Sequence, residues 1–110
     1  ALPALFDCYR QGRISLEEIV QKTSHNLATL FNIRERGYVR EGYWADLALV
    51  DLDKPWTAEK SNILSKCGWS PFEGHQFSAS IDKTFVSGNL VYSDGQIVEG
   101  SNGKRLLFDN

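Results

Sequence analysis

The side chains able to perform acid–base chemistry or to bind a metal are few and far apart along the chain. There are two histidines, His25 and His75, and neither belongs to a His-x-His or His-Glu-x-x-His pattern. A hydrolytic zinc site needs several His, Cys, Asp or Glu ligands that converge on one ion. We interpret His25 as a solvated or capping-region residue and His75 as an exposed loop residue. The sequence therefore predicts no metal ligand and no general base at either position.

The two cysteines are the remaining candidates for a nucleophile or a disulfide. Cys67 lies between Lys66 and Gly68, and a neighbouring ammonium lowers a thiol pKa. No His-Asn or His-Asp constellation accompanies it, so we interpret Cys67 as a buried or half-buried thiol. Cys8 falls on a helical pattern and is expected to pack in the core. One bridge is an alternative, but two free thiols in a reducing compartment are favoured.

Two aspartates could suggest a pair of catalytic carboxylates and two glycines a phosphate-binding loop, but their spacing argues against both sites. Asp46 and Asp51 bracket one apolar run, and in an extended chain they lie about 16 Å apart on opposite faces. Asp46 is instead expected to accept hydrogen bonds from backbone amides of the turn at Gly42. Gly37 and Gly42 do not form a phosphate loop, which requires Gly-Lys-Ser/Thr between a strand and a helix. The large aromatic residues are interpreted as core or interface anchors: Tyr43, Trp44, Trp56 and Trp69.

Length and composition indicate a folded domain or part of one. The chain has 110 residues, of which 42% are hydrophobic and 24% are charged. A net charge of -2 gives no reason to expect nucleic acid or an anionic membrane as a partner. No apolar run approaches the roughly 20 residues of a membrane span, so a cytoplasmic protein is expected. Without any methionine, and with helical spacing from Leu2 onward, the chain is expected to be cut from a longer protein.

Apolar residues at helical spacing predict three helical segments in the first third of the chain. The first covers residues 3–11. The second starts at Ser15, which opens a sequence with capping-box spacing. The third covers about residues 26–32, with Ser24 or Asn26 expected to cap its start. The apolar positions expected to face the core are Leu16, Ile19 and Val20 on the second segment and Leu27, Leu30 and Phe31 on the third.

After Gly37 the pattern changes to short apolar runs between turn residues. Residues 45–52 predict a strand that is apolar on both faces and therefore needs cover on both sides. Pro55 restricts the next short strand to a sheet edge. Residues 62–77 are expected to form a loop. Further strands are expected at 83–86, 90–92, 96–98 and 105–108, the first two joined by a hairpin turn at 87–89.

The order of these motifs resembles the C-terminal end of the amidohydrolase superfamily. Leu-Pro at 2–3, Gly-Arg-Ile-Ser-Leu-Glu-Glu at 12–18, Thr-Ser-His-Asn-Leu-Ala at 23–28 and Ala-Asp-Leu at 45–47 carry the resemblance. Lys-Cys-Gly-Trp-Ser-Pro-Phe-Glu-Gly at 66–74, followed by Thr84-x-x-x-Gly88, narrows it to the cyclic amidohydrolases. Among these the chain looks most like the dihydroorotases, with allantoinases and hydantoinases close behind. One departure is Leu27, where relatives usually carry Pro, a change expected to affect helix capping only. The motif positions interpreted as structural are Asn26, Gly37, Gly42, Asp46, Pro71, Gly74 and Gly88.

The resemblance implies an α+β chain with a defined place in a larger enzyme. Enzymes of the family have a metal-bearing (β/α)8 barrel, with its site at the C-terminal ends of the strands, and a small β-sandwich built from both chain ends. Residues 1–35 would be the closing helices of the barrel, and residues 36–110 the C-terminal part of the sandwich. The family's zinc ligands have no counterpart here, so no catalytic or metal-binding residue is carried over. The resemblance implies a parent enzyme that interconverts carbamoyl-aspartate and dihydroorotate; the alternative is a stand-alone, non-catalytic binding or assembly module.

Self-association is the first testable expectation. Without the N-terminal strands, the sandwich is expected to expose unpaired strand edges and an apolar face, and both favour association. The expected partners are the N-terminal remainder of the enzyme and, for the chain alone, other copies of itself. Light scattering at high protein concentration should therefore report a dimer or a larger species, and a monodisperse monomer would contradict this expectation.

Overall fold

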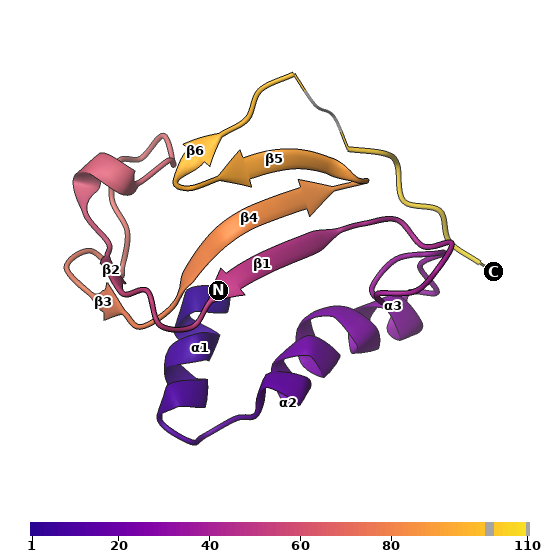
Figure 1. Cartoon of the computed structure of the whole chain (residues 1–110), viewed down its shortest axis with the longest axis horizontal. Helices are drawn as coiled ribbons and strands as arrows, with labels where there is room; N and C mark the ends of the chain where they lie inside the picture. Colours follow the sequence, from indigo (N-terminus) through magenta and orange to yellow (C-terminus); the bar gives the residue numbers. More distant parts are fainter. Residues whose placement is uncertain (101–102, 110) are drawn as a thin grey trace.

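The helices and the main sheet form separate layers in the computed structural model, which describes residues 1–100 and 103–109 (Figure 1). The α-helices come first in the chain, a short 3-10 helix (Lys60–Asn62) lies between the second and third strands, and every strand pairing is antiparallel. This arrangement confirms the α+β class expected from the sequence.

The first two helices begin and end close to the expected residues. Helix α1 spans Leu2–Arg10, and its proline lies in the first turn, where the missing N–H costs nothing. Helix α2 spans Leu16–Val20 and follows Ser15 as its N-cap. The Ser15 hydroxyl accepts a hydrogen bond from the Glu18 amide at 3.1 Å, while the Glu18 carboxylate accepts from the Ser15 amide at 3.4 Å. The expected capping box is therefore confirmed.

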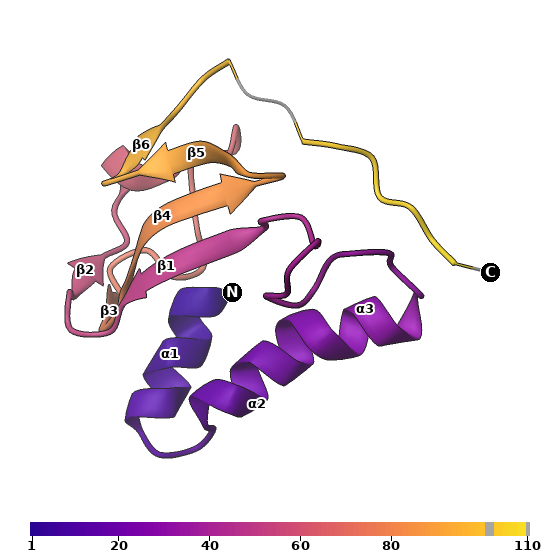
Figure 2. The ribbon, with the colours of Figure 1, turned by 45° about the vertical axis from the view of Figure 1, so that its right-hand side comes forward.

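The third helix does not have a separate start. A π-helical turn, Gln21–His25, joins α2 to α3 (Asn26–Leu30), and the three form one rod (Figure 2). Asn26 has helical torsion angles, and its amide donates to the Gln21 carbonyl five residues earlier. The cap expected at Ser24 or Asn26 is therefore wrong, because the rod has no new N-terminus with free amides there. Leu27 likewise lies inside the rod, so its difference from the usual proline does not act through a cap.

The main sheet has four strands in the order β1-β4-β5-β6. Its central hairpin turns at Ser87 and Gly88, whose φ angles of 51° and 83° are those of a two-residue turn with both central residues left-handed. The expected hairpin is confirmed, although β4 begins before the expected residue 83. The strands are β1 (Leu47–Asp51), β4 (Ser80–Val86), β5 (Asn89–Ser93) and β6 (Gln96–Ile97).

A second, two-stranded sheet pairs β2 (Trp56–Thr57) with β3 (Gln76–Phe77). The first of these is the short strand expected after Pro55. The second lies at the end of the segment 62–77, which the sequence predicted to be entirely loop. Two residues are too few to produce an alternating pattern, so the sequence could not indicate β3.

The strand expected at residues 105–108 is wrong. Only Phe108 pairs, through an isolated bridge to Ile33 in the loop after α3. The segment leaves the sheet beyond β6 and runs beside the end of α3 (Figure 1). It therefore does not extend the sheet.

The buried core lies between the first helices and one end of the main sheet. Phe6, Ile19 and Ala79 form its centre, and Val50 of β1 packs against it. Leu49 remains 49% exposed, so among the described residues β1 is not covered on both faces as expected. Val20, Leu27, Leu30 and Phe31, expected to face the core, are also exposed.

Gly37 allows the loop after α3 to lie directly on the helical rod. Its φ is +88°, and a Cβ built there would lie 2.5 Å from the Ala28 Cβ and 3.1 Å from the Ser24 carbonyl oxygen. Gly42 has a similar φ of +84° but no heavy atom within 4 Å of such a Cβ. A side chain at either glycine would strain the backbone, but only a side chain at Gly37 would also collide with the helical rod.

Substitution of these glycines tests the close approach. Both Gly37→Ala and Gly42→Ala place a Cβ in the left-handed region, which costs about 1–2 kcal/mol. Gly37→Ala should cost about 1–3 kcal/mol more, because the helix would have to move away. Urea unfolding of the two variants measures the difference, and equal losses of unfolding free energy would show that the contact with Ala28 does not matter.

Candidate functional site

Three polar side chains gather between α1 and the strand β3. Asp7 accepts a hydrogen bond from the Ser78 amide at 2.9 Å and from the Ser78 hydroxyl at 2.7 Å, both on Oδ1. Its Oδ2 lies 2.8 Å from Nε2 of His75. The Asp7 side chain is only 17% exposed. This Asp7 cluster (Asp7, His75 and Ser78) joins residues about seventy positions apart in the chain.

The Asp7 cluster contains the residue types of a serine hydrolase triad in an order that cannot act as one. In a triad the imidazole lies between the hydroxyl and the carboxylate and takes the hydroxyl proton. Here the carboxylate is central, and Ser78 donates to Asp7 rather than to His75. Ser78 is therefore not activated as a nucleophile. The cluster fastens α1 to the start of β4.

The environment of Asp7 favours its ionised form. Partial burial raises the pKa of this carboxyl, but the hydrogen bonds from His75 and Ser78 and the charge of His75 lower it by more. The net pKa lies below the ordinary value of 3.8. His75 is exposed as expected, yet it has a partner that the sequence did not indicate.

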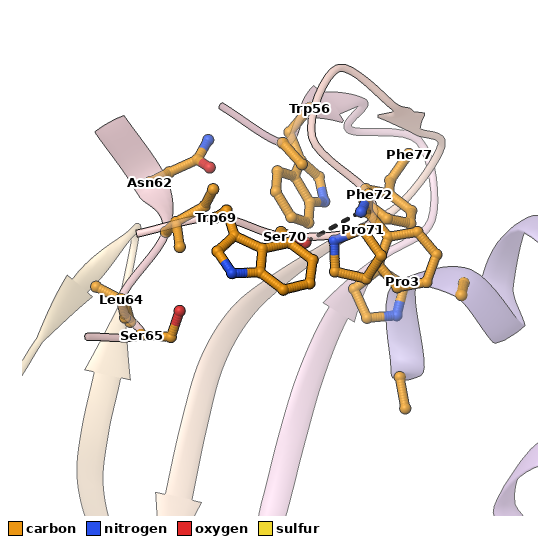
Figure 3. A pocket seen from close by; sticks show the side chains of 14 residues that line it. Pro3, Trp56, Asn62, Leu64, Ser65, Trp69, Ser70, Pro71, Phe72 and Phe77 are labelled. Atoms are coloured by element: carbon orange, nitrogen blue, oxygen red, sulfur yellow. Dashed lines mark hydrogen bonds between the residues drawn. The ribbon is translucent and has the colours of Figure 1, made fainter. Parts of the chain in front are cut away.

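An apolar hollow of about 320 Å³ lies between the first turn of α1 and the loop that follows β2 (Figure 3). Two of its polar side chains already have partners: the Asn62 side-chain amide donates to the Thr57 carbonyl and accepts from the Glu59 amide, and the Ser70 hydroxyl accepts from the Phe72 amide. None of the described residues that line it carries a charged side chain. The hollow therefore offers shape and apolar contact without a reacting group. Its larger lining residues are Pro3, Trp56, Leu64, Trp69, Pro71, Phe72 and Phe77.

Cys67 lies in the same loop and is exposed, not buried or half-buried as expected. The loop stands away from the hydrophobic core, so the core does not cover the Cys67 thiol. Hydrogen bonding with the Ser65 hydroxyl, 3.1 Å away, lowers the pKa of the thiol below 9.0, and a hydrogen bond with the Trp69 backbone adds to this. The lowering does not come from Lys66, as the sequence had suggested. No histidine is bonded to Cys67, so the loop holds no Cys-His pair.

Asp46 belongs to a structural cluster centred on the buried Arg36. Arg36, 6% exposed, bonds the Asp46 carboxylate, and it also donates to the Ser87 hydroxyl at 3.2 Å. The second Asp46 oxygen accepts from the Ser87 amide at 2.7 Å. The expectation that Asp46 bonds the turn at Gly42 is therefore wrong. Its partner Ser87 is 41 residues away, where spacing along the chain carries no signal.

The other singled-out positions lie on separate elements and do not meet in one site. His25 is half-buried at the junction with α3, stacks on Tyr38 with ring centroids 4.1 Å apart, and makes no side-chain capping hydrogen bond. The Gly74 amide bonds the Ala58 carbonyl, and the Gly88 amide bonds the Ala45 carbonyl. Among residues 1–100 and 103–109, no three His, Cys, Asp or Glu side chains are placed to hold a metal ion. Nor does this described part contain a helix long and apolar enough to cross a membrane.

Comparison with known proteins decides the family. Residues 7–98 match the Amidohydrolase family. The chain belongs to this family. The dihydroorotase of Pyrococcus furiosus is 31% identical over 106 residues, which are 96% of this chain and 25% of that protein. An allantoinase of Desulfitobacterium hafniense is 35% identical over 102 residues, or 93% of this chain and 23% of that protein.

Solved structures extend the likeness of this amidohydrolase chain to the fold. The L-hydantoinase of Arthrobacter aurescens superposes with a TM-score of 0.83 at 30% sequence identity. The match covers 89% of this chain and 22% of the hydantoinase. The amidohydrolase chain thus spans about a quarter of the length of the relatives it matches.

The pKa of Asp7 gives a pH-dependent prediction. Because the pKa of the Asp7 carboxyl is lower in the folded state, its ionised form stabilises the fold above pH 3.8. This contribution disappears as the pH falls through the folded-state pKa. Asp7→Asn should therefore lose about 1–3 kcal/mol of unfolding free energy at pH 6, and the deficit should shrink as the pH falls below about 3.8.

Asp53→Asn is the matched control, because Asp53 is 89% exposed and bonds only at the surface with Arg10. It should cost less than about 0.5 kcal/mol at every pH. A deficit of Asp7→Asn that stays constant between pH 6 and pH 3 would contradict the assigned role of the carboxylate.

Proposed function

We propose that this chain is the C-terminal portion of a dihydroorotase-like, metal-dependent cyclic amidohydrolase, and that it supplies scaffold rather than reacting groups. One observation carries the proposal. Nearly the whole chain matches a quarter of a dihydroorotase, while the described residues contain no cluster able to bind a catalytic metal. The polar clusters that do exist, around Asp7 and Arg36, are fully used in holding elements together.

The proposed parent enzyme interconverts carbamoyl-aspartate and dihydroorotate in the cytoplasm, as a step of pyrimidine synthesis. Zinc in such an enzyme polarises the ring amide and activates a water molecule. The described residues do not provide a ligand set for it, so we assign the metal to the remainder of the parent polypeptide. Allantoinase or hydantoinase activity is the alternative within the same reaction class, since relatives of both kinds match this chain.

Within the parent we assign residues 1–35 to the closing helices of the barrel and residues 36–110 to the β-sandwich. The main partner proposed is the N-terminal remainder, which would pair with the open edge of β1 and cover Leu47 and Leu49. Both side chains are exposed in the described chain. The same edge accounts for the self-association expected of the isolated chain. Neither nucleic acid nor a membrane is proposed as a partner.

A stand-alone, non-catalytic binding or assembly module is the second candidate. The observation that favours it is that no group of three His, Cys, Asp or Glu side chains in the described part of the chain is placed to hold a metal ion. The gene sequence upstream of the codon for Ala1 distinguishes the two candidates. A continuous upstream frame that encodes a His-x-His pair supports the enzyme, whereas a frame that begins at or just before Ala1 supports the module.

Activity measurements test the proposal directly. The 110-residue chain alone should bind no stoichiometric zinc and should not hydrolyse dihydroorotate, because it lacks ligands for the metal. The parent polypeptide should do both, and it should prefer dihydroorotate to allantoin and hydantoin. Hydrolysis of dihydroorotate by the isolated chain would overturn the scaffold role. If the parent prefers allantoin or hydantoin, the proposed substrate is wrong, but the proposed reaction class, hydrolysis of a cyclic amide, is kept.

A further inference from the structure

The segment Gly103–Asp109 crosses from the main sheet to the end of α3 (Figure 1). Its first residues attach to the β4–β5 hairpin. The Lys104 amide donates to the Ser87 hydroxyl at 3.2 Å, and the Lys104 carbonyl accepts from Arg36 at 3.4 Å. One end of the segment is thus held by the Arg36 cluster.

Its last residues attach to the loop that follows α3. The Arg34 amide donates to the Leu107 carbonyl, and the Asp109 amide donates to the Asn32 carbonyl, both at 2.8 Å. The Asp109 carboxylate also accepts from Arg34, at 2.9 Å from Nε and 2.6 Å from Nη2. Two backbone bonds and one forked ion pair therefore fix this end.

Little apolar burial supports either the segment or the helix end that it holds. All residues from 103 to 109 are exposed, and Leu30 in the last turn of α3 is 71% exposed. The core around Phe6 and Ile19 lies at the opposite end of the helical layer. Regions with few buried apolar contacts and exposed hydrogen bonds open at lower free energy than the core.

We propose that Gly103–Asp109 is a strap that fastens the end of α3 to the β4–β5 hairpin and opens as a unit while the main sheet stays folded. Leu106 of the strap, together with Leu27 and Ile33, lines a hollow of about 320 Å³ on the helical rod. Opening would therefore free the loop after α3 and uncover an apolar strip of the rod. This inference does not depend on the proposed enzymatic function.

Native-state hydrogen exchange of the whole chain, in urea well below the unfolding midpoint, tests the strap. The Arg34 and Asp109 amides should exchange together, at least about tenfold faster than the paired amides of β1 and β4. Their rates should be nearly independent of urea, because local opening exposes little surface, whereas the sheet amides should accelerate. Equal rates and equal urea dependence would overturn the proposal, as would a complete lack of protection at Arg34 and Asp109.

Substitutions separate the strap from general stability. Asp109→Asn should speed exchange at Arg34 by about two- to fivefold and leave the amides of β4 unchanged, because it removes one exposed ion pair. Asp53→Asn removes a comparable exposed pair with Arg10 and should leave Arg34 unchanged. Equal acceleration of Arg34 and β4 by Asp109→Asn would show that the segment belongs to the global folding unit and would overturn the proposal.

Discussion

The buried guanidinium of Arg36 is the constraint on which the rest of this structure depends. An arginine side chain removed from water is tolerated only if its charge and its donors are paired. Arg36 meets this condition through Asp46, Ser87 and the Lys104 carbonyl, and its guanidinium also lies over the Trp44 ring, 5.1 Å from the centroid. These partners come from three parts of the chain. One side chain therefore fixes where the sheet begins, where its central hairpin turns and where the following segment passes.

The same need to pair buried or partly buried polar groups explains why the described carboxylates of Asp46 and Asp7 are not free to react with a substrate. Both carboxylate oxygens of Asp46 are hydrogen-bonded, one to Arg36 and the other to Ser87. Both carboxylate oxygens of Asp7 are also hydrogen-bonded, one to His75 and the other to Ser78. Among the described residues that are not exposed, no buried side-chain nitrogen or oxygen lacks a hydrogen-bond partner. A catalytic site needs groups that remain available to a substrate. Membership in the amidohydrolase family is compatible with this arrangement, because the described polar residues around Arg36 and Asp7 serve to position elements.

Local features could be read from the sequence, and contacts between distant residues could not. The capping box at Ser15 and the hairpin at Ser87 and Gly88 depend on neighbours within a few residues, so both were predicted. The partners of Asp46 and Asp7 lie about forty to seventy residues away, where no local pattern indicates them. The exposure of Cys67 was missed for a related reason, since burial depends on what packs over a loop. The recognised motifs placed the chain in the amidohydrolase family but did not describe the contacts that these motifs make.

The π-helical turn Gln21–His25 has a consequence for how this rod accommodates its own sequence. A turn with hydrogen bonds five residues apart absorbs one residue more than an α-helical turn, and each residue rotates the helix by about 100°. In a regular α-helix, Ile19 and Ala28 would lie on nearly opposite sides, because nine residues make two and a half turns. The extra residue brings the buried Ala28 back toward the side of Ile19 and leaves Leu27 and Leu30 outside. The rod therefore behaves as an α-helix that carries a one-residue insertion. Loss of any one residue between 21 and 25 would therefore turn this segment into a regular α-helix and keep the half that receives Gly37 in phase with the half that faces the core.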